Sequence, residues 1–426
     1  MVRTRWIVIG GAVVGGVVGG AIALTAGGGH SAVIAGPSAS GSPSASVTAA
    51  ISAPPAPTPS AAPSGFLPVD SLGAKSIPWD QVGAGWFLVD WAQRDAVWGG
   101  FDSASPTVSA ADASVSLLAP DGTWYAARSL NDVESDRTVG WLGETVALFR
   151  TTRPGEEESQ GDTSFLNVKT GAARLVISGG EPPSLQGVLA DGTLHGREYA
   201  EDASWYVRYN DRFEAHTVCD GDSSSVAPDG VRVACLGWIG SGDATSDQTR
   251  VFLGALNTDA GAEAIDTFRL EPYSYDIQGW LDPDTFLLLR RDPDGLARPT
   301  YFAYNVATRK IADFALPFQP TGDNVTFDWL TKTYADMAEQ SVSFFASDGA
   351  KVADVPCAGS WDWRGPVRSG TRAVVECDTF DSDYNPEAVT LTLVDLATGT
   401  VTVVAHADES ASTHLRAVYP YIGNVD

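Results

Sequence analysis

Between residues 85 and 426 the chain alternates short apolar and β-branched runs with turns rich in Gly, Asp, Asn and Pro. Apolar side chains recur at every second position within a run, as in strands with one buried face, and no stretch shows convincing helical periodicity. Many runs are paired around an Asn or Asp with Gly or Thr, the residues that tight hairpin turns need. Seven hairpins are predicted, at residues 116–127, 166–177, 206–216, 253–265, 303–314, 344–354 and 392–404.

A further pair of runs precedes each of the last six hairpins, at residues 139–149, 188–196, 225–235, 279–289, 328–336 and 366–375. The first hairpin follows a single run at 85–91, and the chain ends with residues 414–426, which supply a strand of the missing kind. Seven units of four strands, one of them completed by both chain ends, predict an all-β, seven-bladed β-propeller closed by the C-terminal strand. Such closure removes exposed sheet edges.

The runs also repeat with a period of about 140 residues, which indicates a repeat architecture. Three of them open at residues 145, 193 and 231, and matching runs open at 285, 333 and 371. One more period after residue 285 reaches residue 425, at the chain end. The period therefore predicts three duplicated blades and one extra blade made from the two ends.

The four cysteines follow the same period, because the steps from Cys219 to Cys357 and from Cys235 to Cys377 both lie close to it. An even number of cysteines in an exported protein indicates disulfides. Since each pair holds equivalent positions in the two copies, we predict Cys219–Cys235 and Cys357–Cys377. No Cys-x-x-Cys is present, which argues against a metal site there.

The N-terminus has the pattern of a membrane segment. Arg3 and Arg5 precede an uncharged run over residues 6–26, about the length that a spanning helix needs. The two Arg predict a cytoplasmic N-terminus and a body outside the cytoplasm. An uncleaved signal-anchor is favoured over a cleaved signal peptide, whose apolar region is shorter, although residues 21–23 would serve as a cleavage site.

Residues 27–65 consist almost wholly of Ala, Ser, Pro, Gly and Thr, a composition that favours disorder because it offers little apolar surface to bury. Fully extended, this linker would reach about 120 Å. The chain thus divides into a transmembrane segment (1–26), a disordered linker (27–65) and a propeller (66–426).

The charge of the body is strongly negative. Of 27 Lys and Arg only Arg3 and Arg5 precede residue 66, whereas all 53 Asp and Glu follow it, so 25 basic side chains face 53 acidic ones there. This balance excludes nucleic acid as a partner. It favours solubility, cations or basic partners, and the body is expected to be a monomer.

The longest predicted loops join second to third strands, which places them on one rim of a propeller. They cover residues 92–112, 152–163, 239–249, 290–299 and 378–388, with Trp98, Phe101 and Tyr384 among their aromatic residues. Long loops on a rigid scaffold are where binding usually occurs, so the rim is a candidate site for a basic protein or peptide, a cation or a glycan. Alternatively, the acids keep the rim soluble. The candidate residues are Glu156, Glu157, Glu158, Asp162, Asp243, Asp247, Asp292, Asp294, Asp381, Asp383 and Glu387.

One of these loops contains a candidate calcium motif. Asp381, Asp383 and Asn385 have the oxygen spacing with which calcium loops begin. Pro386 and Thr392 replace the Gly and Glu that such a loop needs at positions six and twelve. No other cofactor is expected.

Two second strands carry unusual polar residues. His195, Arg197 and Glu198 lie in one predicted strand, residues 193–199, and Asp336 and Glu339 lie in the matching one, residues 333–339. Polar groups in a buried layer are costly unless they are paired, so these residues form a satisfied network, reach the exposed strand end, or form an acid–base site. The Trp at 141, 280 and 329 recur at one blade position and are interpreted as packing between blades.

Several motifs together resemble the TolB-type β-propellers. They are APDG at 227–230, the GW turns at 140–141 and 279–280, and the Asp/Asn-Thr-Gly hairpins. The linker and residues 77–91 (IPWDQVGAGWFLVDW) are similar to membrane-anchored TolB-like proteins of actinobacteria. The resemblance implies an extracytoplasmic propeller of unassigned function and transfers no functional residue.

Enzyme signatures are absent: the sequence contains no G-x-S-x-G, H-E-x-x-H, P-loop or G-x-G-x-x-G. We therefore expect a membrane-tethered binding module at the cell envelope. Because the many acids leave paired carboxylates open, a hydrolase or lyase acting on envelope glycans or lactones is the alternative.

Overall fold

The structure is a computed structural model, and the chain divides into two units, Met1–Thr58 and Pro59–Asp426. All residues that the structure describes belong to the second unit. They are residues 76–93, 113–129, 136–151, 161–178, 184–188, 194–200, 203–209, 215–220, 223–239, 248–257, 262–269, 274–291, 298–322, 324–357, 360–361, 365–380, 386–408 and 413–421.

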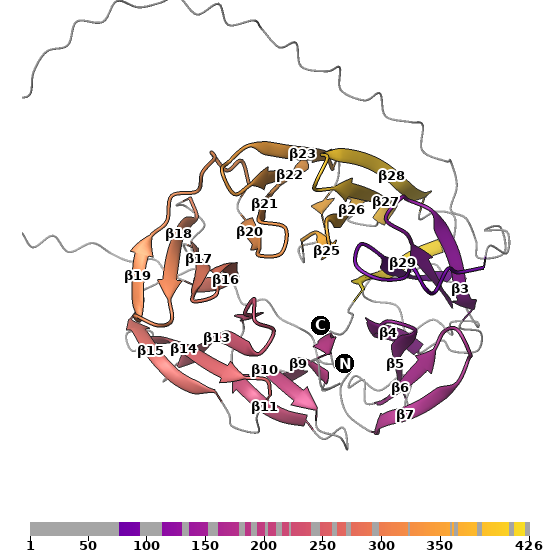
Figure 1. The fold of residues 1–426 in the computed structure, drawn as a ribbon, viewed down its shortest axis with the longest axis horizontal. Helices are drawn as coiled ribbons and strands as arrows, with labels where there is room; N and C mark the ends of the chain where they lie inside the picture. The colour runs from indigo at the N-terminus through magenta and orange to yellow at the C-terminus, as the bar shows by residue number, and fades with distance from the viewer. Residues whose placement is uncertain are drawn as a thin grey trace, which may run out of the picture. The chain divides into compact units, whose positions relative to one another are not determined.

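Seven antiparallel sheets are arranged as a ring of blades, as Figure 1 shows. In five of the sheets consecutive strands pair in chain order, and the innermost strand of each sheet lies nearest the axis of the ring. First strands of neighbouring blades contact one another, as β4 (Asp136–Leu142) does with β8 (Ser184–Val188) and β16 (Ser274–Asp282) does with β20 (Asn324–Asp328). The predicted seven-bladed propeller is confirmed.

The two ends of the described chain meet in blade 1. The C-terminal strand β29 (Thr413–Pro420) pairs with β1 (Phe87–Gln93), with Phe87 opposite Pro420 and Gln93 opposite Thr413. This pairing closes the ring as the sequence predicts. The rest of blade 1 is β2 (Ala113–Leu118) and β3 (Trp124–Ser129).

Blades 2 to 4 form the first repeat. Blade 2 contains β4 (Asp136–Leu142), β5 (Thr145–Thr151), β6 (Gly161–Asn167) and β7 (Ala173–Ser178). Blade 3 contains β8 (Ser184–Val188), β9 (Leu194–Ala200), β10 (Ala203–Tyr209) and β11 (Ala215–Asp220). Blade 4 contains β12 (Ser223–Val226), β13 (Arg232–Ile239), β14 (Gln248–Ala255) and β15 (Glu263–Arg269).

Blades 5 to 7 form the second repeat. Blade 5 contains β16 (Ser274–Asp282), β17 (Thr285–Arg291), β18 (Thr300–Asn305) and β19 (Lys310–Asp313). Blade 6 contains β20 (Asn324–Asp328), β21 (Thr333–Ala338), β22 (Ser341–Ala346) and β23 (Lys351–Pro356). Blade 7 contains β26 (Arg372–Phe380), β27 (Pro386–Asp395) and β28 (Thr400–Asp408), and its innermost position holds two short strands, β24 (Ser360–Trp361) and β25 (Val367–Ser369).

The second strands confirm the period. Strands β5 and β17 begin at residues 145 and 285, β9 and β21 at 194 and 333, and β13 and β26 at 232 and 372. Within each pair the two starts are separated by the predicted period to within a single position, so three blades are duplicated and blade 1 is the additional one.

Both predicted disulfides are present, and each joins two neighbouring blades of one repeat. Cys219 of β11 bonds to Cys235 of β13, which links blade 3 to blade 4. Cys357 directly follows β23 and bonds to Cys377 of β26, which links blade 6 to blade 7. All four cysteines are buried, so the bridges lie within the layers between blades.

Apolar side chains from facing sheets build those layers. Trp141 of β4 is fully buried with Leu88 and Val115 of blade 1, and Trp280 of β16 packs with Ala234 and Leu236 of blade 4. The Trp280 indole also donates a hydrogen bond to the Ser225 carbonyl of blade 4 (3.2 Å). The interpretation of Trp141 and Trp280 as packing between blades is confirmed, and Trp329 packs partly buried at the blade 5–6 layer.

In six of the seven sheets the register shifts between the third and fourth strands. Such bulges bend and twist the outermost strand, which makes its open edge a poorer template for pairing with another chain.

Candidate functional site

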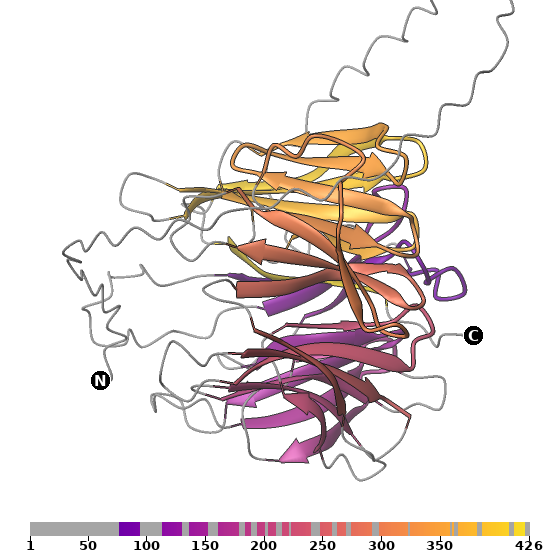
Figure 2. The ribbon, with the colours of Figure 1, turned by 90° about the vertical axis from the view of Figure 1, so that its left-hand side faces the viewer.

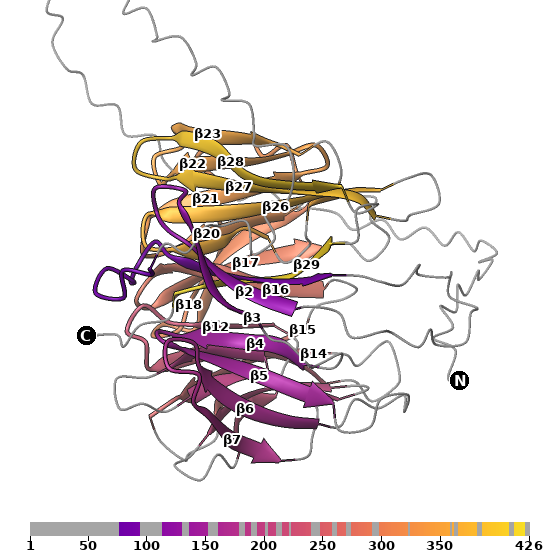
Figure 3. The same ribbon diagram turned by 90° about the vertical axis from the view of Figure 1, so that its right-hand side faces the viewer.

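The strand order gives the ring two distinct ends. At one end, first strands turn into second strands and third into fourth; we call it the turn end. At the other end, second strands lead to third strands and each blade leads to the next; we call it the rim end. Figure 2 and Figure 3 show the sheets from two opposite sides, with the strands running between these two ends.

Residues 76–86 cover part of the turn end before the chain enters β1. The Gly85 amide donates a hydrogen bond to Ser369 Oγ in blade 7 (2.8 Å). Ile77 and Trp79 pack against the cluster between blades 1 and 2, and Lys169 Nζ of blade 2 lies 5.9 Å from the Trp79 ring centroid. The chain therefore enters the propeller at the turn end, across blades 2, 1 and 7.

Many acids at the turn end are paired with Lys or Arg. Ion pairs join Lys169 to Glu144 (2.7 Å) and Lys351 to Asp354 (3.0 Å). Two arginines make further pairs there, with carboxylates of the turns: Arg232 with Asp229 (2.6 Å) and Asp284 (3.0 Å), and Arg372 with Asp395 (2.5 Å).

Local hydrogen bonds stabilise two of these carboxylates in the charged form. Burial acts to raise the pKa of Asp229, but hydrogen bonds from the Arg232 backbone and side chain and from the Val231 amide lower it below the usual value. Burial likewise acts to raise the pKa of Asp395, and hydrogen bonds from Thr398 and Ala397 with the charge of Arg372 lower it. Much of the acidity at this end is thus neutralised locally.

The eleven candidate rim acids all lie between a second and a third strand or in the first two residues of a third strand. Nine of them fall outside the described residues, in the segments that join β5 to β6, β13 to β14, β17 to β18 and β26 to β27. Asp162 and Glu387 lie at the rim-end starts of β6 and β27, and their side chains are outside the described set. Trp98, Phe101 and Tyr384 also lie outside it.

The calcium candidate Asp381, Asp383 and Asn385 lies outside the described residues as well. Within the part of the chain that the structure describes, no three His, Cys, Asp or Glu side chains gather into a group that could hold a metal ion.

The polar residue Asp336 in second strand β21 belongs to a satisfied network. Its carboxylate is fully buried and accepts hydrogen bonds from Thr321 N (2.7 Å), Thr321 Oγ1 (2.9 Å) and Gly322 N (3.0 Å). Since Thr321 and Gly322 precede β20, the carboxylate fixes the connection from blade 5 to blade 6. Glu339 lies exposed in the turn after β21.

His195 in β9 is 6% exposed, and its burial lowers its pKa from 6.5 to about 4. The imidazole is therefore neutral at physiological pH, and it lies opposite Arg208 of β10. The side chains of Arg197 and Glu198 are outside the described set. His195 and Asp336 are in different blades, so the two strands do not form one acid–base site.

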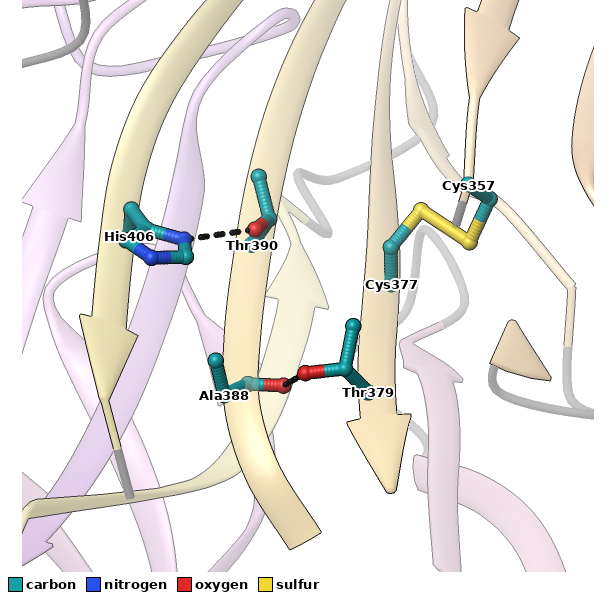
Figure 4. Close-up of a disulfide and its surroundings, with 6 residues drawn as sticks. All are labelled: Cys357, Cys377, Thr379, Ala388, Thr390 and His406. Atoms are coloured by element: carbon teal, nitrogen blue, oxygen red, sulfur yellow. Dashed lines mark hydrogen bonds between the residues drawn. A yellow bond between two sulfur atoms is a disulfide. The ribbon is translucent and has the colours of Figure 1, made fainter. Parts of the chain in front are cut away.

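The sheet of blade 7 carries a row of polar side chains near the rim end, as Figure 4 shows. The pairing register places Cys377, Thr390 and His406 side by side on β26, β27 and β28. Thr390 Oγ1 and His406 Nδ1 are 2.8 Å apart, and both residues are partly exposed. Closer to the rim, Thr379 Oγ1 donates to the Ala388 carbonyl (3.2 Å).

Blades 3 and 6 differ from the others at the rim end. Their second and third strands are joined by two residues each, 201–202 and 339–340, whereas the other blades use longer segments: 94–112, 152–160, 240–247, 292–299 and 381–385. The repeat explains the match, because blades 3 and 6 occupy the same place in the two copies. The connection between second and third strands is therefore short in two of the seven blades.

Sequence reasoning missed Thr390, His406 and the Arg232 and Arg372 contacts. The two arginines lie one repeat period apart in the sequence, and this was a signal that could have found them. Thr390 and His406 gave no comparable signal, because their pairing depends on the bulge between Leu391 and Thr392, which shifts the register of β28.

In the described part of the chain there is no helix long and apolar enough to cross a membrane, and residues 1–26 are outside that part.

The sequence matches no family model and no curated protein. Solved structures with a similar fold include TolB from Acinetobacter baumannii, at 10% identity over 86% of this chain and 88% of TolB (TM-score 0.40). They also include an oligogalacturonate lyase in complex with manganese, at 13% identity over 71% of this chain and 83% of the lyase (TM-score 0.45). A third is a puromycin-hydrolyzing peptidase from Mycobacterium tuberculosis, at 13% identity over 68% of this chain and 49% of the peptidase (TM-score 0.43).

This chain thus spans about half the length of that peptidase. At these identities the likeness concerns the fold alone.

Proposed function

We propose that this protein is a membrane-tethered binding module of the cell envelope, and that its acidic rim captures a basic protein or peptide. The observation that carries the proposal is the strand order. It attaches all eleven candidate acids to the same end of the ring, although they are spread from residue 156 to residue 387. A cluster of one charge sign on a rigid scaffold attracts partners of opposite charge.

The electrostatics of the turn end support this choice of surface. There, carboxylates such as Asp229 and Asp395 are paired with Arg232 and Arg372. These two carboxylates are therefore less available to a basic partner than unpaired acids are.

Two features support an extracytoplasmic position. The disulfides Cys219–Cys235 and Cys357–Cys377 are typical of proteins outside the cytosol. The apolar residues 6–26 after Arg3 and Arg5 supply the proposed anchor, and residues 27–65 supply the linker. Residues 76–86 lead into β1 at the turn end of the propeller.

The binding proposal is tested with two variants of equal charge change. The rim variant carries Glu156→Gln, Glu157→Gln, Glu158→Gln, Asp243→Asn and Asp247→Asn. The control carries substitutions of the same kind at exposed acids of the turn end, namely Asp80, Asp121, Glu263, Asp282 and Asp348. The probe is an oligoarginine peptide of about twelve residues, which spans about 40 Å when extended.

We expect the rim variant to bind the peptide at least about tenfold more weakly than the unaltered protein, and the control to bind within about twofold of it. Calorimetry at two salt concentrations measures both. If both variants lost affinity for the peptide equally, binding would depend on net charge and not on the rim. If the unaltered protein did not bind the peptide, the proposal would be overturned.

Localisation has a separate test. Protease added to intact cells is expected to cut within residues 27–65 and release a folded propeller into the medium. Protection of the propeller until the cells are lysed would contradict the proposed topology.

A further inference from the structure

Blade 7 is taller than blade 6 at the rim end. Strands β21, β22 and β23 of blade 6 have six residues each, whereas β26, β27 and β28 have nine, ten and nine. The two-residue turn of Glu339 and Gln340 ends blade 6 there, and Figure 3 shows β26 and β27 extending past β21 and β22. A step therefore separates the two blades.

Described polar residues border this step. Glu339 and Gln340 are exposed in the turn of blade 6. The Cys357 amide donates to the Gln340 carbonyl (2.8 Å), and Cys357 is bonded to Cys377 of blade 7. Cys377 begins the row that continues to Thr390 and His406. We call these residues the ledge: Glu339, Gln340, Thr379, Thr390 and His406.

The Cys357–Cys377 disulfide holds the two sides of the ledge together. The disulfide fixes the end of β23 against β26, and the hydrogen bond from the Cys357 amide to the Gln340 carbonyl ties the turn of blade 6 to the same point. A site whose two sides are fixed before binding loses less conformational freedom when a partner binds.

The first repeat has the same disulfide but not the same polar row. In blade 4, Cys235 lies opposite Phe252, and Phe252 lies opposite Ala264. Phe252 packs against the apolar cluster around Cys219 and Cys235. The second repeat replaces this apolar pair by Thr390 and His406, although both copies build the same blade junction. Packing therefore does not require the polar pair.

We propose that the ledge binds the main chain of an extended, basic polypeptide segment of the partner. Peptide amides and carbonyls pair with side chains that can donate and accept hydrogen bonds. The ledge offers such groups in the Thr390 hydroxyl, the His406 imidazole and the side-chain amide of Gln340. Basic side chains of the segment lie along Glu339 and the acidic rim. The inference rests on the proposed function. It adds that the partner binds at the ledge and that the bound part is an extended polypeptide segment.

Charge decides between partners. The ledge contains one carboxylate and no Lys or Arg, which complements a basic chain and disfavours acidic glycans or phosphates. The step is also bordered by the two-residue turn of blade 6, whereas its neighbour blade 5 has a connection at 292–299. An extended segment can lie across this short turn and contact β27 and β28 beside it.

The test substitutes the polar row and keeps the rim acids. The ledge variant carries Thr390→Val and His406→Ala, and the matched control carries Thr398→Val and Thr400→Val. Thr398 and Thr400 form a comparable side-chain pair (2.9 Å) at the turn end of the same β27–β28 hairpin. With the oligoarginine peptide, we expect about tenfold weaker binding by the ledge variant and no change for the control.

The outcomes separate the two proposals. If the rim variant loses binding while the ledge variant binds as tightly as the unaltered protein, the proposal that the ledge binds the peptide is overturned and the rim proposal stands. If the unaltered protein does not bind the peptide, both fail.

A measurement on the unaltered protein covers the case in which the ledge variant does not fold. Bound oligoarginine is expected to protect His406 from diethyl pyrocarbonate, as followed by mass spectrometry, while partly exposed His216 in β11 reacts at an unchanged rate. Equal reaction of His406 with and without the peptide would overturn the ledge.

Discussion

Arg232 and Arg372 lie one repeat period apart and hold the same kind of contact at two places in the ring. Arg232 Nη2 donates to the Pro283 carbonyl of blade 5 (2.7 Å), and Arg372 Nε donates to the Pro120 carbonyl of blade 1 (3.0 Å). Each arginine opens the second strand of its own blade, 4 or 7, and reaches a turn of the following blade. The repeat has thus duplicated a clamp between blades.

The clamp predicts a stability cost for either arginine. Arg232→Lys and Arg372→Lys keep the charge but lose the planar fork that serves a carboxylate and a carbonyl together. We expect each to lower the free energy of unfolding by about 1–2 kcal/mol, as measured by urea denaturation. Lys169→Ala is the control, because the Lys169–Glu144 pair is nearly half exposed, and its loss is expected to stay within about 0.5 kcal/mol. Equal losses at all three positions would show that the contacts with Pro283 and Pro120 contribute nothing.

The disulfides give a second prediction. Each closes a loop of 16 or 20 residues in sequence, for which chain entropy gives about 3 kcal/mol. Replacing either pair by Ala should lower the stability by about that amount, and because the bridges lie in different blade pairs the two losses should add. Thermal unfolding of the two single variants and the combined variant measures this. A combined loss far from the sum would mean that the two bridges are energetically coupled.

The repeat explains why the fold was predictable and the ledge was not. Turn residues such as those at 227–230 and the spacing of the cysteines can be recognised directly in the sequence. They were sufficient to predict the blades, the closure of the ring and both disulfides. For Asp336 the sequence left open a satisfied network, an exposed strand end or an acid–base site, and the hydrogen bonds from Thr321 and Gly322 show that it belongs to a network.

The ledge depends on height and register, which local sequence does not specify. Thr390 and His406 pair because a bulge in β28 shifts its register against β27. Both are partly exposed beside blade 6, whose strand β23 is shorter than β26 and β28. Both facts arise from pairing between strands. The acidic rim, by contrast, was predicted from topology and stays a prediction for its individual side chains.

A third prediction concerns pH. The unfolded chain protonates His195 near pH 6.5, but the buried imidazole of the folded protein does so only near pH 4. The unfolded state therefore binds the extra proton between these values, and the free energy of unfolding should fall as the pH decreases from about 6.5 to about 4, by about 3 kcal/mol in total. Urea denaturation of the unaltered protein at pH 7 and pH 4.5, compared with His195→Gln, measures the difference. His216→Gln is the control, and a pH dependence unchanged by His195→Gln would contradict the assignment.

The last prediction concerns the joint between the chain ends. Asp90 of β1 accepts hydrogen bonds from Thr138 N (3.1 Å) and Thr138 Oγ1 (2.7 Å), and Tyr419 Oη of β29 donates to the Thr138 carbonyl (2.6 Å). Strands from both ends of the chain thus hold the same residue of blade 2. Asp90→Ala leaves a buried amide without its acceptor and should cost about 3 kcal/mol, whereas Tyr419→Phe should cost about 1 kcal/mol.

Because both groups act through Thr138, the double variant should depart from the sum of the single losses by at least about 0.5 kcal/mol. Hydrogen exchange should also become faster in β29 and β1 than in β17, since opening the joint exposes these strands before the rest of the ring unfolds. A uniform increase over all blades would instead mean that the ring opens and unfolds in one step, with no separate role for the joint.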